Sequence, residues 1–288
     1  MPIVDDPYDF GRIAATNAIS DVYAMGGRPI MALALVGMPI NVLPAEVIAR
    51  ILEGGESVCR AAGIPIAGGH SIDSAEPIYG LVALGLVHPK LVKRNADARA
   101  GDRIILGKPL GVGILSPAFK KDAPQGDLLC RAVDAENYAK MIAVTTQLNT
   151  PGPELAALPG VHAMTDVTGF GLAGHALELA RAAQCSLNIE WSRVPLIDGV
   201  LKLAADGIVT GASGRNFASY GHDIALQADF APEAKALLTD PQTSGGLLVT
   251  CSADSVTAVL DTFRKHGFAS ATEIGTVGPR SDVLLTVR

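Results

Sequence analysis

Aromatic and charged residues are scarce in this chain of 288 residues. Phe, Trp and Tyr together make up 5% of the sequence, and charged residues make up 18%. There are 23 Lys and Arg against 29 Asp and Glu, which gives a net charge of −6, and no run of basic residues occurs. We therefore expect no nucleic-acid-binding surface, and a phosphate ligand would need metal ions or backbone N–H groups to offset the acidic balance.

Cysteine is also scarce, and its spacing excludes two common uses. The sequence contains no CxxC pair, so it indicates neither a zinc site nor a disulfide framework. Each cysteine is expected to be a small buried hydrophobic residue. The four are Cys59, Cys130, Cys185 and Cys251.

Long apolar runs are missing as well. None approaches the roughly 18 residues that a membrane span needs. The first residues lack the basic charge and long apolar run of a signal peptide. These features predict a cytoplasmic protein with no membrane partner. The 49% hydrophobic content is enough for a sizeable core, and the length suits two domains.

Strand-like and helix-like segments alternate along the chain, which is typical of an α/β or α+β protein. In the first part, helical spacing of apolar residues predicts helices over 7–27 and 44–62. The nearly continuous apolar runs 29–38 and 78–87 predict strands, and the first of them is expected to be buried on both faces. Further on, the glycine-containing segment 207–216 is expected to be a loop.

A polar stretch, 88–102, is predicted to link two domains. The expected domains are therefore 1–98 and 99–288.

The segment 165–171 (TDVTGFG) follows a short predicted strand and precedes a helix that starts near Phe170. Asp166 ends the strand, two glycines allow a tight turn, and Thr168 could cap the helix. A carboxylate at such a turn, beside free helix N–H groups, can hold a divalent cation against a phosphate. The alternative is that Asp166 only caps the helix.

Three other positions are open to a functional or a structural interpretation. Asp21 falls in the last turn of the first predicted helix, where the helix dipole disfavours a carboxylate, so it either needs a cation nearby or faces water. The segment 68–71 (GGHS) follows a short predicted strand and could cradle a phosphate, or could be only a tight turn. Lys108, in the glycine-rich segment 107–113, could touch a phosphate, but a solvated loop lysine is the simpler expectation.

Taken together and in this order, these segments resemble the selenophosphate synthetase (selenide, water dikinase) family. That family belongs to the aminoimidazole ribonucleotide synthetase-like superfamily. The resemblance implies a two-domain fold of that type, in which the N-terminal domain pairs with a second copy in a homodimer. The matching segments cover nearly the whole chain and are 2–11, 14–21, 68–71, 165–171 and 240–247.

The resemblance also implies a reaction and a site. The family converts ATP, selenide and water to selenophosphate, AMP and phosphate, with Mg²⁺ on the polyphosphate. Residue by residue, it implies that Asp21 and Asp166 hold Mg²⁺, and that Asp21, Gly69, His70 and Ser71 contribute to ATP binding. These roles are chemically consistent, because carboxylates can lie beside a polyphosphate only through bridging cations.

The sequence departs from the family at its beginning. Family members carry a further N-terminal segment with a catalytic Cys or selenocysteine, a Lys, a glycine-rich stretch and two more metal-binding aspartates. No counterpart is found in this sequence, so we assign no catalytic residue and expect an N-terminal domain truncated at its start, with impaired selenophosphate synthesis. The alternatives are a non-catalytic remnant that binds nucleotide or dimerises, or another ATP-using enzyme of the superfamily.

Overall fold

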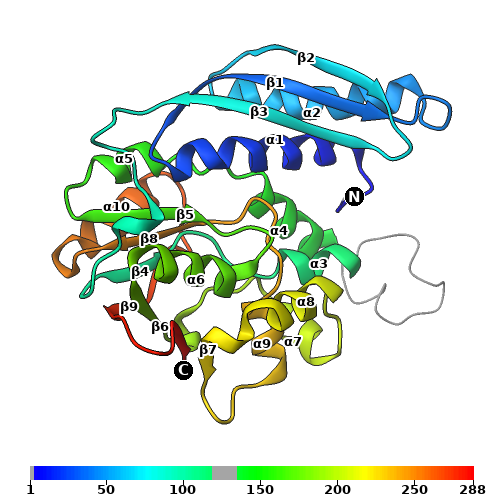
Figure 1. Ribbon diagram of the computed structural model, residues 1–288. Coiled ribbons are helices and arrows are strands. Elements are labelled where there is room, and N and C mark those ends of the chain that lie inside the picture. The colour runs from blue at the N-terminus through cyan, green and yellow to red at the C-terminus, as the bar shows by residue number, and fades with distance from the viewer. Residues whose placement is uncertain (1–2, 119–134) are drawn as a thin grey trace.

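The computed structural model describes residues 3–118 and 135–288, which form two layers (Figure 1). The upper layer in Figure 1 is a three-stranded sheet with two helices beneath it. The lower layer is built on a seven-stranded sheet with helices around it. The predicted mixed α/β and α+β class is confirmed. The polar, Pro- and Gly-containing stretch 116–128 is expected from its sequence to be exposed, but its residues 119–128 lie outside the described residues, as does Cys130.

The upper layer alternates helices and strands along the chain. Strand β1 is central, parallel to β2 and antiparallel to β3, and both helices cover the same face of this sheet. Asp6 caps α1 by accepting a hydrogen bond of 2.9 Å from the Asp9 N–H, as expected for an aspartate at that position. The elements are α1 (Pro7–Ala24), β1 (Arg28–Met38), α2 (Ala45–Ala61), β2 (Ile66–Asp73) and β3 (Ile78–Leu86).

One face of the three-stranded sheet is not covered by the described residues, so the prediction that β1 is buried on both faces was wrong for the single chain. Ala32 and Met38 are buried against the helices, but Leu35 is 48% exposed. A strand in a sheet with helices on one side only buries alternate residues. The uncovered side, called the open face below, carries six exposed apolar residues: Leu35, Ile72, Ile78, Val82, Leu84 and Leu86.

The segment 68–71 belongs to β2 and is not the predicted loop. The strand continues to Asp73, with Gly69 opposite Ala34 and His70 opposite Leu35 on β1. Gly69 has a φ of +153°, and a Cβ there would collide with the Ala34 carbonyl oxygen, so this close approach requires glycine. Pairing with β1 is a long-range contact, and it decides that this segment is a strand.

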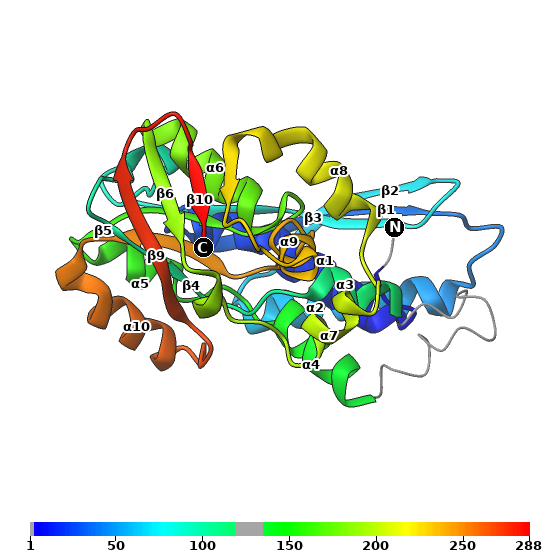
Figure 2. The same cartoon turned by 90° about the horizontal axis from the view of Figure 1, so that it is seen from below.

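The seven-stranded sheet of the lower layer has the order β5-β8-β4-β9-β6-β10-β7. Figure 2 shows α6 and α10 on opposite sides of this sheet. Its elements are β4 (Arg103–Leu106), α3 (Val112–Ala118), α4 (Ala135–Thr145), α5 (Gly152–Ala157), β5 (Val161–Asp166), α6 (Gly171–Ala183), β6 (Cys185–Ile189), α7 (Val200–Ala205), α8 (Gly211–Tyr220), β7 (Ile224–Leu226), α9 (Pro232–Leu238), β8 (Leu247–Cys251), α10 (Val256–Lys265), β9 (Thr272–Pro279) and β10 (Leu285–Val287).

The two faces of this sheet have separate cores. Leu172 and Leu177 of α6 pack with Leu285 on one face. On the other face, Phe263 of α10 packs with Leu155 of α5 and with residues of β5 and β8. The three cysteines that the structure describes are buried and free, as predicted: Cys59, Cys185 and Cys251.

Helix α8 occupies most of a segment that was predicted to be a loop. Thr210 caps it by accepting from the Ser213 N–H at 3.1 Å, and the buried Ser213 hydroxyl lies 2.7 Å from the Thr239 hydroxyl. At the other end, the Tyr220 hydroxyl donates to the Phe170 carbonyl. These tertiary contacts outweigh the low helix propensity of Gly211 and Gly214.

Within the ranges 3–118 and 135–288, no helix combines the length and the apolar character that crossing a bilayer requires.

Candidate cation and nucleotide site

Helix α1 lies on the side of the upper layer that faces the lower layer, and it contacts elements of both layers (Figure 1). On the side facing the lower layer, Ile13, Asn17 and Ser20 recur at helical spacing. The Ser244 N–H donates to Asn17 Oδ1 at 2.9 Å, and the Ser244 hydroxyl donates to the Ile13 carbonyl at 3.2 Å. The 240–246 turn is thereby docked on the helix that carries Asp21.

Asp166 lies at the end of β5, where it pairs with Leu247 of β8, and its exposed fraction is only 6%. Ser20 of α1 donates to Asp166 Oδ2 at 2.5 Å, a short bond of the kind that carboxylates form with hydroxyl donors. Oδ1 has no hydrogen-bond partner among the described residues. The alternative that Asp166 only caps the next helix is wrong, because the N-cap of α6 is Phe170, with no side-chain cap bond.

Thr168 does not cap α6 either. Its hydroxyl lies 3.1 Å from His175 Nε2, and His175 Nδ1 lies 2.9 Å from a Glu178 carboxylate oxygen. Gly171, at the start of α6, has a φ of +70° and packs against the Thr239 backbone. The Thr168 side chain faces His175 and not the N–H groups at the start of the helix. Thr168 therefore attaches the 165–171 turn to α6 by its contact with the His175 side chain, and not by capping the helix N-terminus.

Asp21 and Asp166 are brought together at this junction. Repulsion from Asp166 raises the pKa of Asp21, although burial by surrounding protein is the larger cause of the shift. Asp21 remains open to solvent and borders an apolar pocket of about 240 Å³ with Met25 and Leu86. Neither aspartate forms an ion pair within the described part of the chain, although the positive charge of the buried Lys108 attracts Asp166.

Lys108 is buried, which makes the prediction of a solvated lysine wrong. Its exposed fraction is 1%, and its ammonium donates to the carbonyls of Val144, Gln147 and Ser244 at 3.2, 2.6 and 2.7 Å. The first two carbonyls lie at and just beyond the C-terminal end of α4, where helix carbonyls lack partners and attract positive charge. Lys108 thus fastens α4 to the 240–246 turn.

The donor set at the junction suits Mg²⁺ shared with a polyphosphate better than a metal held by protein alone. No group of three or more His, Cys, Asp or Glu side chains able to hold a metal occurs among the residues described. Mg²⁺ commonly takes one or two carboxylates and completes its shell with substrate phosphates and water. Asp21 and Asp166 supply such a pair. In addition, the buried Asn149 Oδ1 beside Ser20 has no hydrogen-bond partner in the part of the chain that the structure describes.

Gly69, His70 and Ser71 do not join Asp21 and Asp166 within the described residues of one chain. They lie on β2, and helices α1 and α2 separate the three-stranded sheet from the lower layer (Figure 1). His70 pairs with Leu35 and therefore shares the open face of the sheet.

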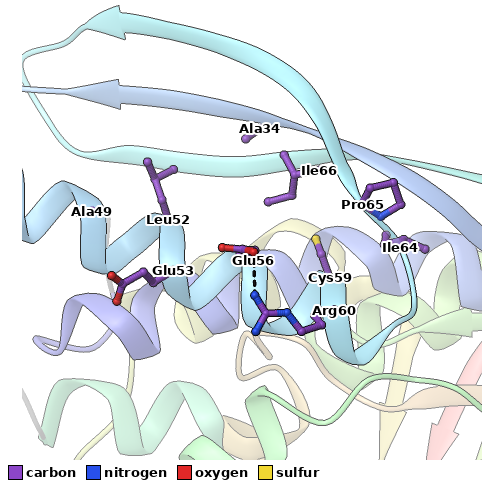
Figure 3. A pocket seen from close by; sticks show the side chains of 10 residues that line it. All are labelled: Ala34, Ala49, Leu52, Glu53, Glu56, Cys59, Arg60, Ile64, Pro65 and Ile66. Carbon is purple, nitrogen blue, oxygen red and sulfur yellow. Dashed lines mark hydrogen bonds and ion pairs between the residues drawn. The ribbon is translucent and has the colours of Figure 1, made fainter.

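A groove of about 670 Å³ lies at another place, between α2 and strands β1 and β2 (Figure 3). Its lining is mostly apolar. Of its three charged residues, Glu56 and Arg60 are paired with each other at 2.7 Å, and Glu53 is paired with Arg50 outside the lining at 2.6 Å. It shares no lining residue with the aspartate pair. The groove contains no unpaired positive charge for a phosphate, so its size does not make it the nucleotide site.

Comparisons with known proteins agree with this architecture. Residues 1–87 match the family model for the AIR synthase related protein N-terminal domain, and residues 99–288 match the model for its C-terminal domain. The selenide, water dikinase of Burkholderia orbicola (strain MC0-3) is 66% identical over 275 residues, which cover 96% of this chain and 75% of that protein. The chain belongs to the selenide, water dikinase family. The resemblance seen in the sequence is therefore confirmed.

Solved structures show the same fold at lower identity. Thiamine-monophosphate kinase from Stenotrophomonas maltophilia K279a is 18% identical, with a TM-score of 0.69 over 98% of this chain and 78% of that one. The hydrogenase maturation protein HypE in complex with ATP is 17% identical, with a TM-score of 0.64 over 94% and 71% of the two chains. The predicted aminoimidazole ribonucleotide synthetase-like fold is confirmed by these matches.

Proposed function

We propose that this chain is a cytoplasmic selenide, water dikinase with impaired activity, and that it binds ATP with Mg²⁺ at the junction of its two layers. The reaction converts ATP, selenide and water to selenophosphate, AMP and phosphate. Membership of the dikinase family supports this reaction, and the single structural observation that carries the site is the meeting of Asp21 and Asp166 at this junction, where neither forms an ion pair with a described residue. HypE, which shares the fold, binds ATP in its solved complex.

Asp21 and Asp166 are the proposed cation ligands. Mg²⁺ supplies neutralisation of the phosphate oxygens as negative charge moves onto the leaving group. The chain's own part is to hold the two carboxylates at a fixed separation, Asp21 from α1 and Asp166 from β5. It also excludes water from Asp166, which is buried.

The remaining site residues fit this function through a second copy of the chain. We propose that residues 1–98 form the ATP-binding and dimerisation domain and residues 99–288 the C-terminal domain. Gly69, His70 and Ser71 then approach the nucleotide across the open face of the three-stranded sheet. The support for dimerisation is the set of exposed apolar side chains on that face, because contiguous apolar patches of this kind mark association surfaces.

Activity tests the proposal directly. The purified 288-residue chain should bind MgATP, yet form AMP in a selenide-dependent manner far more slowly than the Burkholderia orbicola relative assayed beside it. The reason is that these 288 residues match only 75% of that relative's length, and none of them corresponds to the catalytic Cys or selenocysteine and the Lys that the family resemblance implies. Selenide-dependent AMP formation at the relative's rate would contradict the expected impairment. ADP as product would favour another enzyme of the superfamily, and absence of MgATP binding would favour a non-catalytic role.

Leu35→Asp should convert the dimer to monomers. The substitution places a charge in the middle of the open face, where burial of an unpaired carboxylate is strongly unfavourable. Light scattering after size-exclusion chromatography measures the mass. Leu201→Asp is the matched control, since Leu201 is similarly exposed, at 43%, but lies on α7 in the lower layer. A dimer that survives Leu35→Asp, or a wild-type chain that is monomeric at micromolar concentration, would rule out this interface.

A further inference from the structure

Ser20 contacts Oδ2 of Asp166, and Asn149 in turn contacts Ser20. Ser20 belongs to α1, Asn149 follows α4, and Asp166 ends β5, so the three side chains join separate parts of the chain. All are buried, with exposed fractions of 1%, 2% and 6%. The Ser20 hydroxyl lies 2.5 Å from Asp166 Oδ2, and Asn149 Nδ2 lies 2.8 Å from Ser20 Oγ.

The direction of each hydrogen bond in this group is fixed by chemistry. Asn149 Nδ2 lies 2.9 Å from the Gly245 carbonyl, which can only accept, so the amide nitrogen must face it. The second N–H of that amide then donates to Ser20 Oγ. The Ser20 hydroxyl consequently has one direction left for its own proton, toward Asp166 Oδ2.

These hydrogen bonds determine which oxygen of the Asp166 carboxylate is available to coordinate a cation. Oδ2 accepts the short hydrogen bond from Ser20, while Oδ1 has no hydrogen-bond partner among the described residues. A cation that also took Oδ2 would compete with the Ser20 donor for that oxygen, so Asp166 favours coordination through Oδ1 alone. Mg²⁺ requires near-ideal octahedral geometry, whereas the larger Ca²⁺ readily accepts both oxygens of a carboxylate. A carboxylate restricted to one oxygen thus suits Mg²⁺.

We infer that Ser20, held by Asn149, is a positioning residue that keeps Asp166 in a one-oxygen mode and thereby makes the cation site select Mg²⁺ over Ca²⁺. The inference rests on the proposed function, because it takes Asp166 as a cation ligand. Neither residue touches the cation or the nucleotide in this role. Both act through Asp166.

The test compares binding of MgATP and CaATP to the 288-residue chain and to Ser20→Ala by isothermal titration calorimetry. The wild-type chain should prefer MgATP. In Ser20→Ala the carboxylate can rotate and use both oxygens, so the ratio of the CaATP to the MgATP dissociation constant should fall by about tenfold, as for other residues that orient a metal ligand. A merely structural role would weaken both complexes equally and leave the ratio unchanged, which would overturn the inference.

Two further variants keep the outcome interpretable. Asn149→Ala leaves the Ser20 hydroxyl in place but frees its rotation, so it should shift the ratio in the same direction by a smaller factor, and it serves if Ser20→Ala does not fold. Ser57→Ala is the control, since the Ser57 hydroxyl bonds only to the Gly54 carbonyl within α2. A wild-type chain that binds neither complex would refute the proposed function itself. A wild-type chain that binds MgATP, with an unchanged ratio in the folded variants, would refute only the role of Ser20 and Asn149.

Discussion

Asp166→Ala should raise the dissociation constant of MgATP by roughly 100-fold, because removing one partner of a buried, desolvated charge interaction costs about 2–5 kcal/mol. Asp166 is buried and lies beside Asp21, so its loss removes one of the two proposed cation ligands. Asp73→Ala should change the constant by no more than about twofold, since solvated surface charges contribute little. Asp73 is exposed at the end of β2. Calorimetric titration with ATP at fixed Mg²⁺ provides the measurement.

The comparison has an internal control. When Mg²⁺ is replaced by EDTA, the wild-type chain and Asp166→Ala should bind ATP with similar weak affinity, because the aspartate acts through the cation. Equal losses in Asp166→Ala and Asp73→Ala would contradict the assignment of Asp166 as a ligand. So would a difference that persists without Mg²⁺.

Lys108→Met should lower the free energy of unfolding by about 3 kcal/mol. The variant leaves three carbonyls without their donor, at about 1–3 kcal/mol each where no water reaches them. Relief of the buried charge offsets part of this loss. Urea denaturation should show a lower midpoint with an unchanged m-value. Lys202→Met is the control, since Lys202 is exposed and pairs only with Asp206, and it should change stability by less than about 0.5 kcal/mol. An unchanged midpoint for Lys108→Met would show that the three bonds do not stabilise the fold.

Lys108 should also make the free energy of unfolding depend on pH, and the direction of this dependence follows from its pKa. Burial lowers the pKa of Lys108 to about 7 from an ordinary value of 10.5, and attraction to Asp166 only partly opposes this shift. Between these two values the unfolded chain binds the proton that the folded chain has released, so the contribution of Lys108 to the free energy of unfolding rises with pH. The stability difference between wild type and Lys108→Met should therefore widen from pH 7 to pH 9. A difference that narrows over this range would contradict the lowered pKa.

Several features of this protein follow from local sequence. The helical spacing of apolar residues over 7–27 and the apolar run 29–38 correctly predict α1 and β1, because amphipathic periodicity and chain stiffness act over a few residues. The alternation of such segments is enough for the fold class. The ordered set of short segments, from 14–21 to 240–247, identifies the family, which the comparison at 66% identity confirms.

The pairing of distant segments is not contained in local patterns. The glycines of 68–71 are typical of a loop, but hydrogen bonds to β1 make the segment a strand. Gly211 and Gly214 also favour a loop, yet contacts of Ser213 and Tyr220 with the segments at Thr239 and Phe170 stabilise a helix. In both cases a tertiary contact outweighs a propensity of about 1 kcal/mol or less per residue.

The sequence by itself determined the family, the class of fold and the two aspartates proposed as cation ligands. Only the tertiary structure decided what surrounds them. It buried the Lys108 ammonium where three backbone carbonyls accept its hydrogen bonds. It also brought Ser20 and Asn149, which are 129 positions apart, into hydrogen-bond contact. The physical reason is that hydrogen-bond partners and desolvation depend on which parts of the chain meet in space. The residues around Ser20 in the sequence do not indicate that its hydroxyl will donate to the carboxylate of Asp166.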